Sequence, residues 1–370
     1  MKLLASSVIA IALGLVTSLA APGAAPDRRT ENVILFMTDG LRWQEVFTGA
    51  EESLMAKDAG GVSELGALKN AYWRDTPEAR REALMPFLWT VIAREGQIYG
   101  NQHKHSNAEV TNGHKFSYPG YNETLCGFAD PRIDSNGKFS NPNVTVFEWL
   151  HRKPAFQGKV AAFGVWDVFP YIFNRQRCGF PVHAGYEPLE GKLSPRMEML
   201  LTLRDETTRK WPTEPYDCFL FHTALDYFEQ HKPRLFFVSL NETDAWGHEG
   251  RYDNYLESAH RADAYLKMIW ETAQSMNEYR GKTSLIFVPD HGRGDAPVEW
   301  KNHGKKTLRS EFIWMAFLGP DTPPLGERVD VPNVTQSQVA ATLAALLGED
   351  YNAAVAQAGK PIEAVFRSAN

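Results

Sequence analysis

The sequence has few cysteines, no basic block and no internal repeat, and each absence removes a class of protein. Three cysteines in 370 residues, Cys126, Cys178 and Cys218, allow at most one internal disulfide, which excludes a scaffold built on disulfides. The net charge of −6 includes no run of lysine and arginine, so we expect no nucleic acid polymer as a partner. A small-molecule substrate suits this composition better.

Long apolar segments are also missing after the N-terminus. Residues 1–20 carry an early lysine, a short apolar stretch and the small-residue site Ser18-Leu19-Ala20, the pattern of a cleaved signal peptide. We therefore predict export to the periplasm or the medium, and a mature chain without a membrane span. At 43% hydrophobic and 12% aromatic residues, residues 27–370 can bury one large core. The oligomeric state stays open.

Apolar runs typical of buried strands alternate with helical patterns along the chain. The runs are Asn32–Thr38, Lys159–Trp166, Arg234–Leu240, Ser284–Asp290 and Phe312–Gly319. The helical patterns are Pro77–Gly96, Thr145–Arg152, Tyr255–Met276 and Gln336–Leu347. This order predicts an α/β fold with a mainly parallel central sheet and helices on both faces. We expect a single domain with a cap-like insertion at about residues 127–233.

Carboxylates and imidazoles follow three of these runs. Asp39 ends the first, Asp244 and His248 follow Arg234–Leu240, and Asp290 and His291 follow Ser284–Val288. His303 comes shortly afterwards. Ligands of α/β folds gather beyond the carboxyl ends of the strands, and these side chains suit zinc and related divalent ions. Six such ligands exceed the need of one catalytic ion and suggest a pair.

Each piece has a plainer reading when it is taken alone. Asp39 could cap a helix, and His303 could lie in a solvated turn. Ser117, in a stretch where Pro119 and Gly120 disfavour a simple helix, is a candidate nucleophile. A free hydroxyl is a poor nucleophile at neutral pH, and the chain shows no Gly-X-Ser-X-Gly elbow, so a metal pair would have to activate it.

The order of these motifs resembles the alkaline phosphatase superfamily, particularly its nucleotide pyrophosphatase/phosphodiesterase-like branch. The motifs are Asp39-Gly40, Ser117-Tyr118-Pro119, Asp244-X-X-X-His248, Asp290-His291-Gly292 and His303-Gly304. The resemblance implies a two-zinc phosphohydrolase that works through a phosphoseryl intermediate. It also implies that Asp244, His248 and His303 hold one zinc, while Asp39, Asp290 and His291 hold the other, which also binds the oxygen of Ser117.

The substrate class is less defined, because this chain has Ser-Tyr-Pro-Gly-Tyr where that branch typically has Thr-Phe-Pro-Asn-His. Asn136 and Arg293 are candidate phosphate-binding residues, although Asn136 could equally be a turn asparagine. Aromatic residues near the motifs favour phosphate diesters slightly over monoesters. A sulfatase or phosphonate hydrolase is an alternative, but the sulfatase motif requires arginine at the place of Tyr121. A noncatalytic metal-stabilised binding protein is a second alternative, and it would not need a hydroxyl at residue 117.

Overall fold

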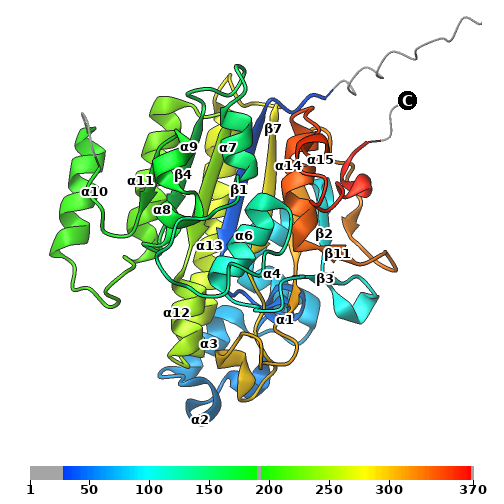
Figure 1. Ribbon diagram of the computed structural model, residues 1–370. Helices are drawn as coiled ribbons and strands as arrows, with labels where there is room; N and C mark the ends of the chain where they lie inside the picture. Colours follow the sequence, from blue (N-terminus) through cyan, green and yellow to red (C-terminus); the bar gives the residue numbers. More distant parts are fainter. Residues whose placement is uncertain (1–27, 190–192, 368–370) are drawn as a thin grey trace, which may run out of the picture.

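The computed structural model of the chain describes residues 28–189 and 193–367, so the predicted signal peptide lies outside the described residues. Its centre is an eight-stranded sheet with the strand order β10-β2-β9-β7-β1-β6-β4-β5 (Figure 1). The main strands are β1 Asn32–Thr38, β4 Val160–Gly164, β6 Leu235–Leu240 and β7 Thr283–Pro289. Each of them lies parallel to its neighbours in this group. The predicted α/β class with a mainly parallel sheet is confirmed.

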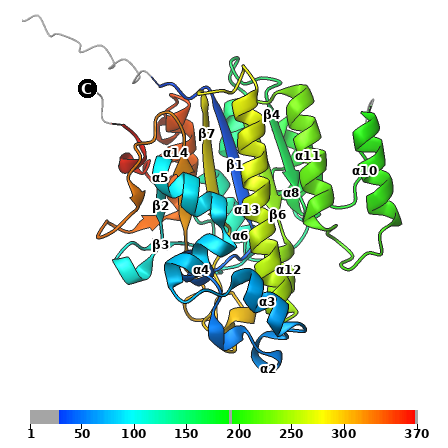
Figure 2. The same cartoon turned by 180° about the vertical axis from the view of Figure 1, so that it is seen from behind.

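Helices cover both faces of the sheet, as the views from the two sides show (Figures 1 and 2). On one face, α6 Ser117–Cys126, α7 Val146–His151 and α14 Val339–Leu346 pack on Val33, Leu35 and Met37 of β1. On the other face, α11 Asp217–His231 and α13 Tyr252–Ser275 pack on Ile34 and Phe36. Successive side chains of β1 therefore enter two different cores, which explains why the strand reads as a continuous apolar run.

Two predicted elements are divided in the structure. The run Phe312–Gly319 forms β8 Phe312–Ile313 and β9 Met315–Leu318, and β9 is antiparallel to β7. The helical pattern Pro77–Gly96 forms α4 Pro77–Leu84, a π-helical turn Leu88–Ile92 and α5 Ala93–Glu95. Pro86 explains the break between α4 and the π-helical turn, because proline disfavours helical geometry in the residue before it and offers no N–H.

The segment of residues 127–233 is not a separate cap. Its strands β4 and β5 Val182–Ala184 extend the central sheet, and α11 covers one face of that sheet. Helix α10 Pro195–Glu206 packs beside α11. Among the described residues, no helix combines the length and the apolarity that a membrane span requires.

The remaining elements are short. The strands are β2 Gln97–Tyr99, β3 Ala108–Glu109, β10 Gly326–Glu327 and β11 Val334–Thr335. Strands β3 and β11 join β8 in a small second sheet. The helices are α1 Trp43–Thr48, α2 Lys57–Gly60, α3 Leu65–Tyr72, α8 Phe169–Ile172, α9 Arg175–Cys178, α12 Glu242–His248 and α15 Tyr351–Ala354. Turns of 3-10 helix occur at Glu52–Leu54, Gln102–Lys104, Glu299–Lys301, Gln336–Gln338 and Glu363–Val365.

Candidate metal centre

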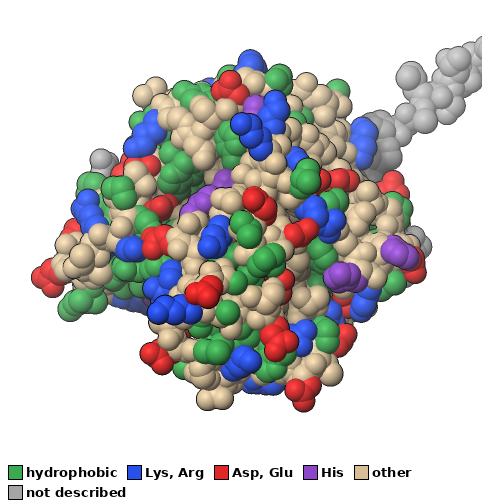
Figure 3. Space-filling model, turned by 90° about the horizontal axis from the view of Figure 1, so that it is seen from below, with side chains coloured by type: hydrophobic (Ala, Val, Ile, Leu, Met, Phe, Trp, Pro, Cys, Tyr) green, Lys and Arg blue, Asp and Glu red, His purple; other side chains and the backbone are tan. Residues whose placement is uncertain are grey.

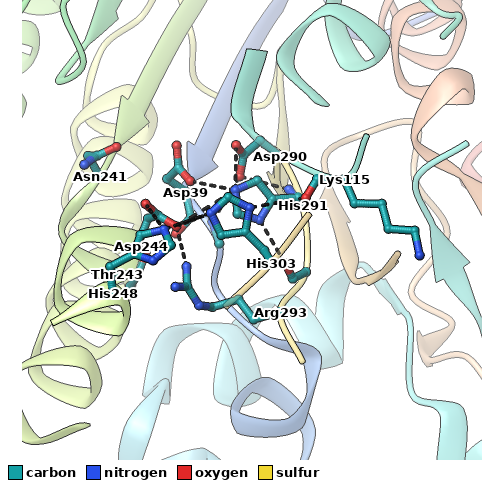
Figure 4. Close-up of polar contacts among 12 residues, drawn as sticks. Asp39, Lys115, Asn241, Thr243, Asp244, His248, Asp290, His291, Arg293 and His303 are labelled. Carbon is teal, nitrogen blue, oxygen red and sulfur yellow. Dashed lines mark hydrogen bonds and ion pairs between the residues drawn. The ribbon is translucent and has the colours of Figure 1, made fainter. Parts of the chain in front are cut away.

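The predicted ligands meet at one edge of the central sheet. Strands β1, β6 and β7 are adjacent and parallel, so the residues that follow their carboxyl ends lie close together. Figure 3 views this edge from below, and a patch of histidine is recessed there among the other side chains. Figure 4 shows carboxylates and imidazoles pointing toward one another: Asp39, Asp244, Asp290, His291 and His303.

Asp39, Asp290 and His291 form a first, fully buried cluster. His291 Nε2 lies 3.1 Å from Asp39 Oδ1 and 3.5 Å from Asp290 Oδ2. These three atoms are buried, and none of them has a hydrogen-bond partner. Buried polar atoms without partners are costly, unless a bound group satisfies them. Two carboxylate oxygens and one imidazole nitrogen that converge in this way fit a divalent ion such as zinc.

The remaining polar atoms of this cluster are all engaged, which fixes its orientation. Asp290 Oδ1 accepts hydrogen bonds from the backbone N–H groups of Gly40 and His291, at 3.0 and 2.9 Å. Asp39 Oδ2 accepts a 3.1 Å hydrogen bond from the hydroxyl of Tyr121. His291 Nδ1 lies 2.9 Å from the carbonyl oxygen of Gly292, to which it donates, so Nε2 is the ring nitrogen that faces the cluster. Each of the three side chains thus uses one polar atom to hold its orientation and leaves another to bind a metal ion.

Gly40 is required at the centre of this arrangement. Its φ is +59°, and a Cβ there would lie 3.0 Å from Asp244 Oδ1 and 2.8 Å from an Arg293 nitrogen. A side chain at residue 40 would therefore strain the backbone and would displace Asp244 and Arg293. This explains why glycine follows Asp39 directly.

Asp244, His248 and His303 form the second cluster. Helix α12 carries Asp244 and His248 one turn apart, so both side chains leave the same face of the helix. His248 Nε2 lies 3.4 Å from Asp244 Oδ2 and 2.9 Å from His303 Nε2. His303 Nδ1 faces the carbonyl oxygen of Lys115 at 3.3 Å, which leaves Nε2 for a metal. His248 is half-exposed and lies at the rim of the centre.

The two clusters adjoin through His291. Its Nε2 is 3.9 Å from Asp244 Oδ1, and its ring stacks on that of His303 with centroids 3.9 Å apart. Asp244, His291 and His303 consequently form a second tight grouping of ligand atoms. All six residues that the sequence proposes as ligands are therefore brought together, and they suffice for two neighbouring divalent ions.

Arg293 lies beneath the ligands rather than among the groups that face solvent. Its Nε donates to the carbonyl oxygen of Trp300 at 2.9 Å, and its two terminal nitrogens contact Asp244 Oδ1 and the carbonyl oxygen of Lys301. The side chain is fully buried. Because all three nitrogens are engaged within the protein, these contacts differ from those expected of a phosphate-binding arginine, and they position Asp244 instead (Figure 4).

The charges at the centre shift the pKa values of its carboxyl groups in opposite directions. Burial, followed by the charge of Asp244, raises the pKa of Asp39 well above its usual value. Burial and the charge of Asp39 do the same to the pKa of Asp290. Burial also raises the pKa of Asp244, but Arg293 and the histidines outweigh it, and this pKa lies below its usual range. Burial and mutual repulsion thus disfavour the ionised carboxylates of the first cluster, and a bound cation would offset this cost.

Ser117 is the first residue of α6, although the sequence around it does not suggest a helix. All ten residues of α6 are buried, so the helix shows no apolar period, and proline is tolerated in the first turn. Gly120 and Tyr121 follow Ser117 by three and four residues and share its face. A Cβ on Gly120 would lie 2.2 Å from the carbonyl oxygen of Asp290, and Tyr121 contacts Asp39. This face of α6 is therefore packed against the first cluster.

Asn136 lies beside the start of the same helix. Its Oδ1 accepts a 3.0 Å hydrogen bond from the backbone N–H of Tyr118. This bond fixes which end of the amide faces the helix, so Nδ2 remains to donate to another group. Asn136 thus lies next to Tyr118, the residue that follows Ser117.

Tyr121 is the main positioning residue that the sequence left unassigned. Besides Asp39, its hydroxyl contacts Ser239 Oγ at 2.9 Å, so it joins α6, β1 and β6 at one buried point. Burial, followed by the charge of Asp39, raises its pKa well above the usual value and keeps the proton that it donates. The only sign of this role in the sequence is that Tyr121 follows Ser117 by four residues, about one helical turn.

Comparisons with known proteins agree with this geometry. Residues 207–308 match the model of the Metalloenzyme superfamily. The mouse protein GPI ethanolamine phosphate transferase 1 is 22% identical over 249 residues, which are 63% of this chain and 24% of that protein. The chain therefore spans about a quarter of the length of this relative.

Two solved structures share most of the architecture. Alkaline phosphatase PafA aligns with a TM-score of 0.54 at 11% identity, over 93% of this chain and 100% of that one. BT1596, a 2-O GAG sulfatase, aligns with a TM-score of 0.54 at 13% identity, over 91% and 74% of the two chains. The chain has the alkaline phosphatase fold. The resemblance to the superfamily found in the sequence is thereby confirmed, and the matched residues 207–308 include five of the six ligands.

Proposed function

We propose that the protein is an exported, two-zinc phosphoric ester hydrolase in which Ser117 is the nucleophile. The observation that carries this proposal is the packing of the first turn of α6 against Asp39 and Asp290. A serine on that face would adjoin the first cluster, whose three buried ligand atoms have no hydrogen-bond partners. A noncatalytic metal protein would need the ligands but no hydroxyl at this point. Export is part of the proposal and follows from the pattern of residues 1–20.

The six ligands divide between two ions. Asp39, Asp290 and His291 would hold the ion beside Ser117, and Asp244, His248 and His303 would hold its neighbour. Divalent ions at these places supply Lewis acidity, which favours the serine alkoxide and stabilises charge on the leaving oxygen. Zinc suits this mixture of carboxylate and imidazole, since both His291 and His303 offer Nε2.

Ser117 would act in two displacements on phosphorus. In the first, the oxygen of the ionised Ser117 bonds to phosphorus, the bond from phosphorus to the leaving alcohol breaks, and the alcohol takes up a proton. In the second, the oxygen of water bonds to phosphorus, the bond from phosphorus to Ser117 Oγ breaks, the proton that the water loses restores the Ser117 hydroxyl, and phosphate or a phosphate monoester leaves. A covalent route of this kind divides one difficult step into two easier ones.

Asn136 would hold the phosphoryl group during both steps. Its Oδ1 is engaged by the N–H of Tyr118, so Nδ2 can donate to a non-bridging oxygen. A fixed donor of this type stabilises charge that develops in the transition state. We propose both diesters and monoesters as substrates. Arg293, which follows the motif Asp290-His291-Gly292, is engaged inside the protein, so its charge does not favour monoester dianions over diesters.

Phosphoric esters are favoured over sulfuric esters by the contacts of Tyr121. The residue occupies the place where the sulfatase motif has arginine, and its hydroxyl binds Asp39 and Ser239 inside the protein. A chain with the same fold can be a sulfatase, as BT1596 shows, so both ester classes belong in the assay.

The proposal is tested with chromogenic phosphate monoesters, diesters, phosphonates and sulfates on the zinc-loaded protein and on Ser117→Ala. We expect turnover of the phosphate esters, retention of zinc by the variant and a loss of turnover by several orders of magnitude. Rapid quench with labelled substrate should trap phosphate on Ser117 of the wild-type protein. Near-native rates for Ser117→Ala would exclude the covalent route, and turnover of sulfates alone would exclude the substrate class.

A further inference from the structure

Glu214 presents a carboxylate to the candidate metal centre from the segment between α10 and α11. Its Oε2 accepts a hydrogen bond from the side-chain amide of Asn241, at the end of β6. Its Oε1 receives no hydrogen bond from the described residues, and the side chain is only partly buried. Asn241 lies three residues before Asp244, so Glu214 is anchored to the segment that carries this candidate ligand, and its other oxygen receives no hydrogen bond from the described residues.

The charges that act on Glu214 are negative. After burial, the charges of Asp244 and Asp167 raise the pKa of Glu214 to about 8. In turn, the charge of Glu214 contributes to the raised pKa of Asp39. Within the described part of the chain, no lysine or arginine forms an ion pair with Glu214, whereas Asp244 is paired with Arg293 and Asp167 with Lys138. Glu214, like Asp39 and Asp290, thus has no lysine or arginine partner among the described residues.

A second oxygen nearby also lacks a partner. Asp167 binds Lys138 through Oδ2 at 2.7 Å, but its Oδ1 is buried and has no hydrogen-bond partner. Gly185 packs on both Asp167 and the backbone of Thr213, so Asp167 lies next to the segment that carries Glu214. Asp167 thus adds a second carboxylate oxygen without a donor close to this segment.

Aromatic rings surround the same segment. Trp211 and Tyr216, on either side of Glu214 in the sequence, have ring centroids 5.4 Å apart. Trp211 also packs on Trp246 of α12 at 4.9 Å. Aromatic faces attract ammonium groups and shield them from water, and a neighbouring carboxylate adds to this attraction. Lys210 Nζ already lies 5.5 Å from the ring centroid of Trp246, so this aromatic group accommodates an ammonium, and such rings suit an organic cation better than a hydrated metal ion.

We infer that Glu214 determines specificity by receiving an ammonium group on one ester substituent, so that the substrates are phosphate esters of amino alcohols. The inference rests on the proposed phosphoester hydrolysis. The ammonium group would contact Glu214 Oε1 while the phosphoryl group lies between Ser117 and Asn136. An amino alcohol carries both groups within a few bonds of each other, which suits a carboxylate anchored through Asn241 to the segment that carries Asp244.

The test compares two esters that differ only in charge. One is p-nitrophenyl phosphorylcholine, and the other is 3,3-dimethylbutyl p-nitrophenyl phosphate, in which carbon replaces the quaternary nitrogen. We expect the zinc-loaded wild-type protein to prefer the cationic ester by about tenfold or more in kcat/KM, the scale of one well-formed charge contact. Glu214→Gln should reduce this ratio to about one. Glu229→Gln, an exposed carboxylate of α11 paired with Arg196, serves as the control and should preserve the ratio.

Each outcome has a separate meaning. Turnover of both esters at equal kcat/KM by the wild-type protein would overturn the role of Glu214 while leaving the hydrolase function intact. A preference for the cationic ester that survives in Glu214→Gln would also overturn it. Turnover of neither ester, nor of any other phosphate ester, would refute the proposed function and this inference with it. Zinc content and thermal unfolding of the variant show whether the fold is retained.

Discussion

The hydroxyl of Tyr121 donates a 3.1 Å hydrogen bond to Asp39 Oδ2, and this contact joins the helix that begins with Ser117 to the end of β1. Tyr121→Phe removes the donor but keeps the ring, which packs edge-on to Phe169. Asp39 would then lose the bond that orients its free oxygen. We expect zinc affinity at the first cluster to fall about 10- to 100-fold, as for other outer contacts of metal ligands.

Competition with a chelator measures this change. Phe139→Leu is a suitable control, because Phe139 stacks on Tyr118 of the same helix without contact to a ligand. A Tyr121→Phe protein that binds zinc as tightly as the wild-type protein would show that Asp39 is oriented by its other neighbours alone.

The two clusters predict a metal content of two ions per chain. Asp290→Asn replaces a charged ligand of the first cluster by a neutral amide, and His248→Ala removes a ligand of the second cluster at its rim. Elemental analysis after dialysis should give about two equivalents for the wild-type protein and about one for each variant, since a catalytic zinc usually has three protein ligands. Full activity of protein stripped of all transition metal would contradict the assignment.

Arg293 gives a sharper test of the structure, because the sequence and the geometry assign it different roles. A phosphate-binding arginine would favour monoester dianions, so its loss would damage monoester turnover far more than diester turnover. The structure has its guanidinium bound to Asp244 and to two carbonyl oxygens. We therefore expect Arg293→Ala to reduce both turnovers by the same factor and to weaken binding of the second ion.

The measurement is kcat/KM for a matched monoester and diester, together with zinc content. Arg293→Lys, which retains a positive charge but not the three-way contact, should restore only part of the metal binding. A loss confined to the monoester, with zinc content unchanged, would return Arg293 to the role of a phosphate clamp.

The sequence predicted the sheet, and the candidate ligands that it proposed meet at one edge, because both depend on local signals. Strands buried on both faces read as apolar runs, and the boundaries of β1 agree with the predicted Asn32–Thr38. The ligands directly follow such runs or lie in a motif, so the order along the chain suffices to place them at one edge.

Other features depend on contacts between distant residues, and the sequence does not reveal them. Helix α6 is buried on all sides, so it has no apolar period to detect. The contacts of Arg293 with residues 244, 300 and 301 arise only when the strand ends meet. The anchoring of Glu214 by Asn241 likewise joins residues 27 positions apart. Such contacts decide which charged side chains face a substrate and which form hydrogen bonds and ion pairs inside the protein.

The last prediction concerns the pH dependence of stability and uses His183, which lies in the edge strand β5 away from the metal centre. Burial, followed by the charges of Arg204 and Arg175, lowers the pKa of His183 from 6.5 to about 4. Between these pH values the unfolded chain binds a proton at His183 and the folded chain does not. The free energy of unfolding should therefore fall as the pH drops through this window, and this residue contributes up to about 3 kcal/mol of that loss.

His183→Gln isolates this contribution, because glutamine does not titrate. Urea unfolding of both proteins from pH 7 to pH 4, with chelator present throughout, should show the stability difference between them shifting by about 3 kcal/mol in favour of the variant as the pH falls. His231→Gln, a change at an exposed histidine of α11, should not alter the pH dependence. If the wild-type protein and His183→Gln lose stability in parallel over this range, then His183 is protonated in the folded chain as readily as in the unfolded one.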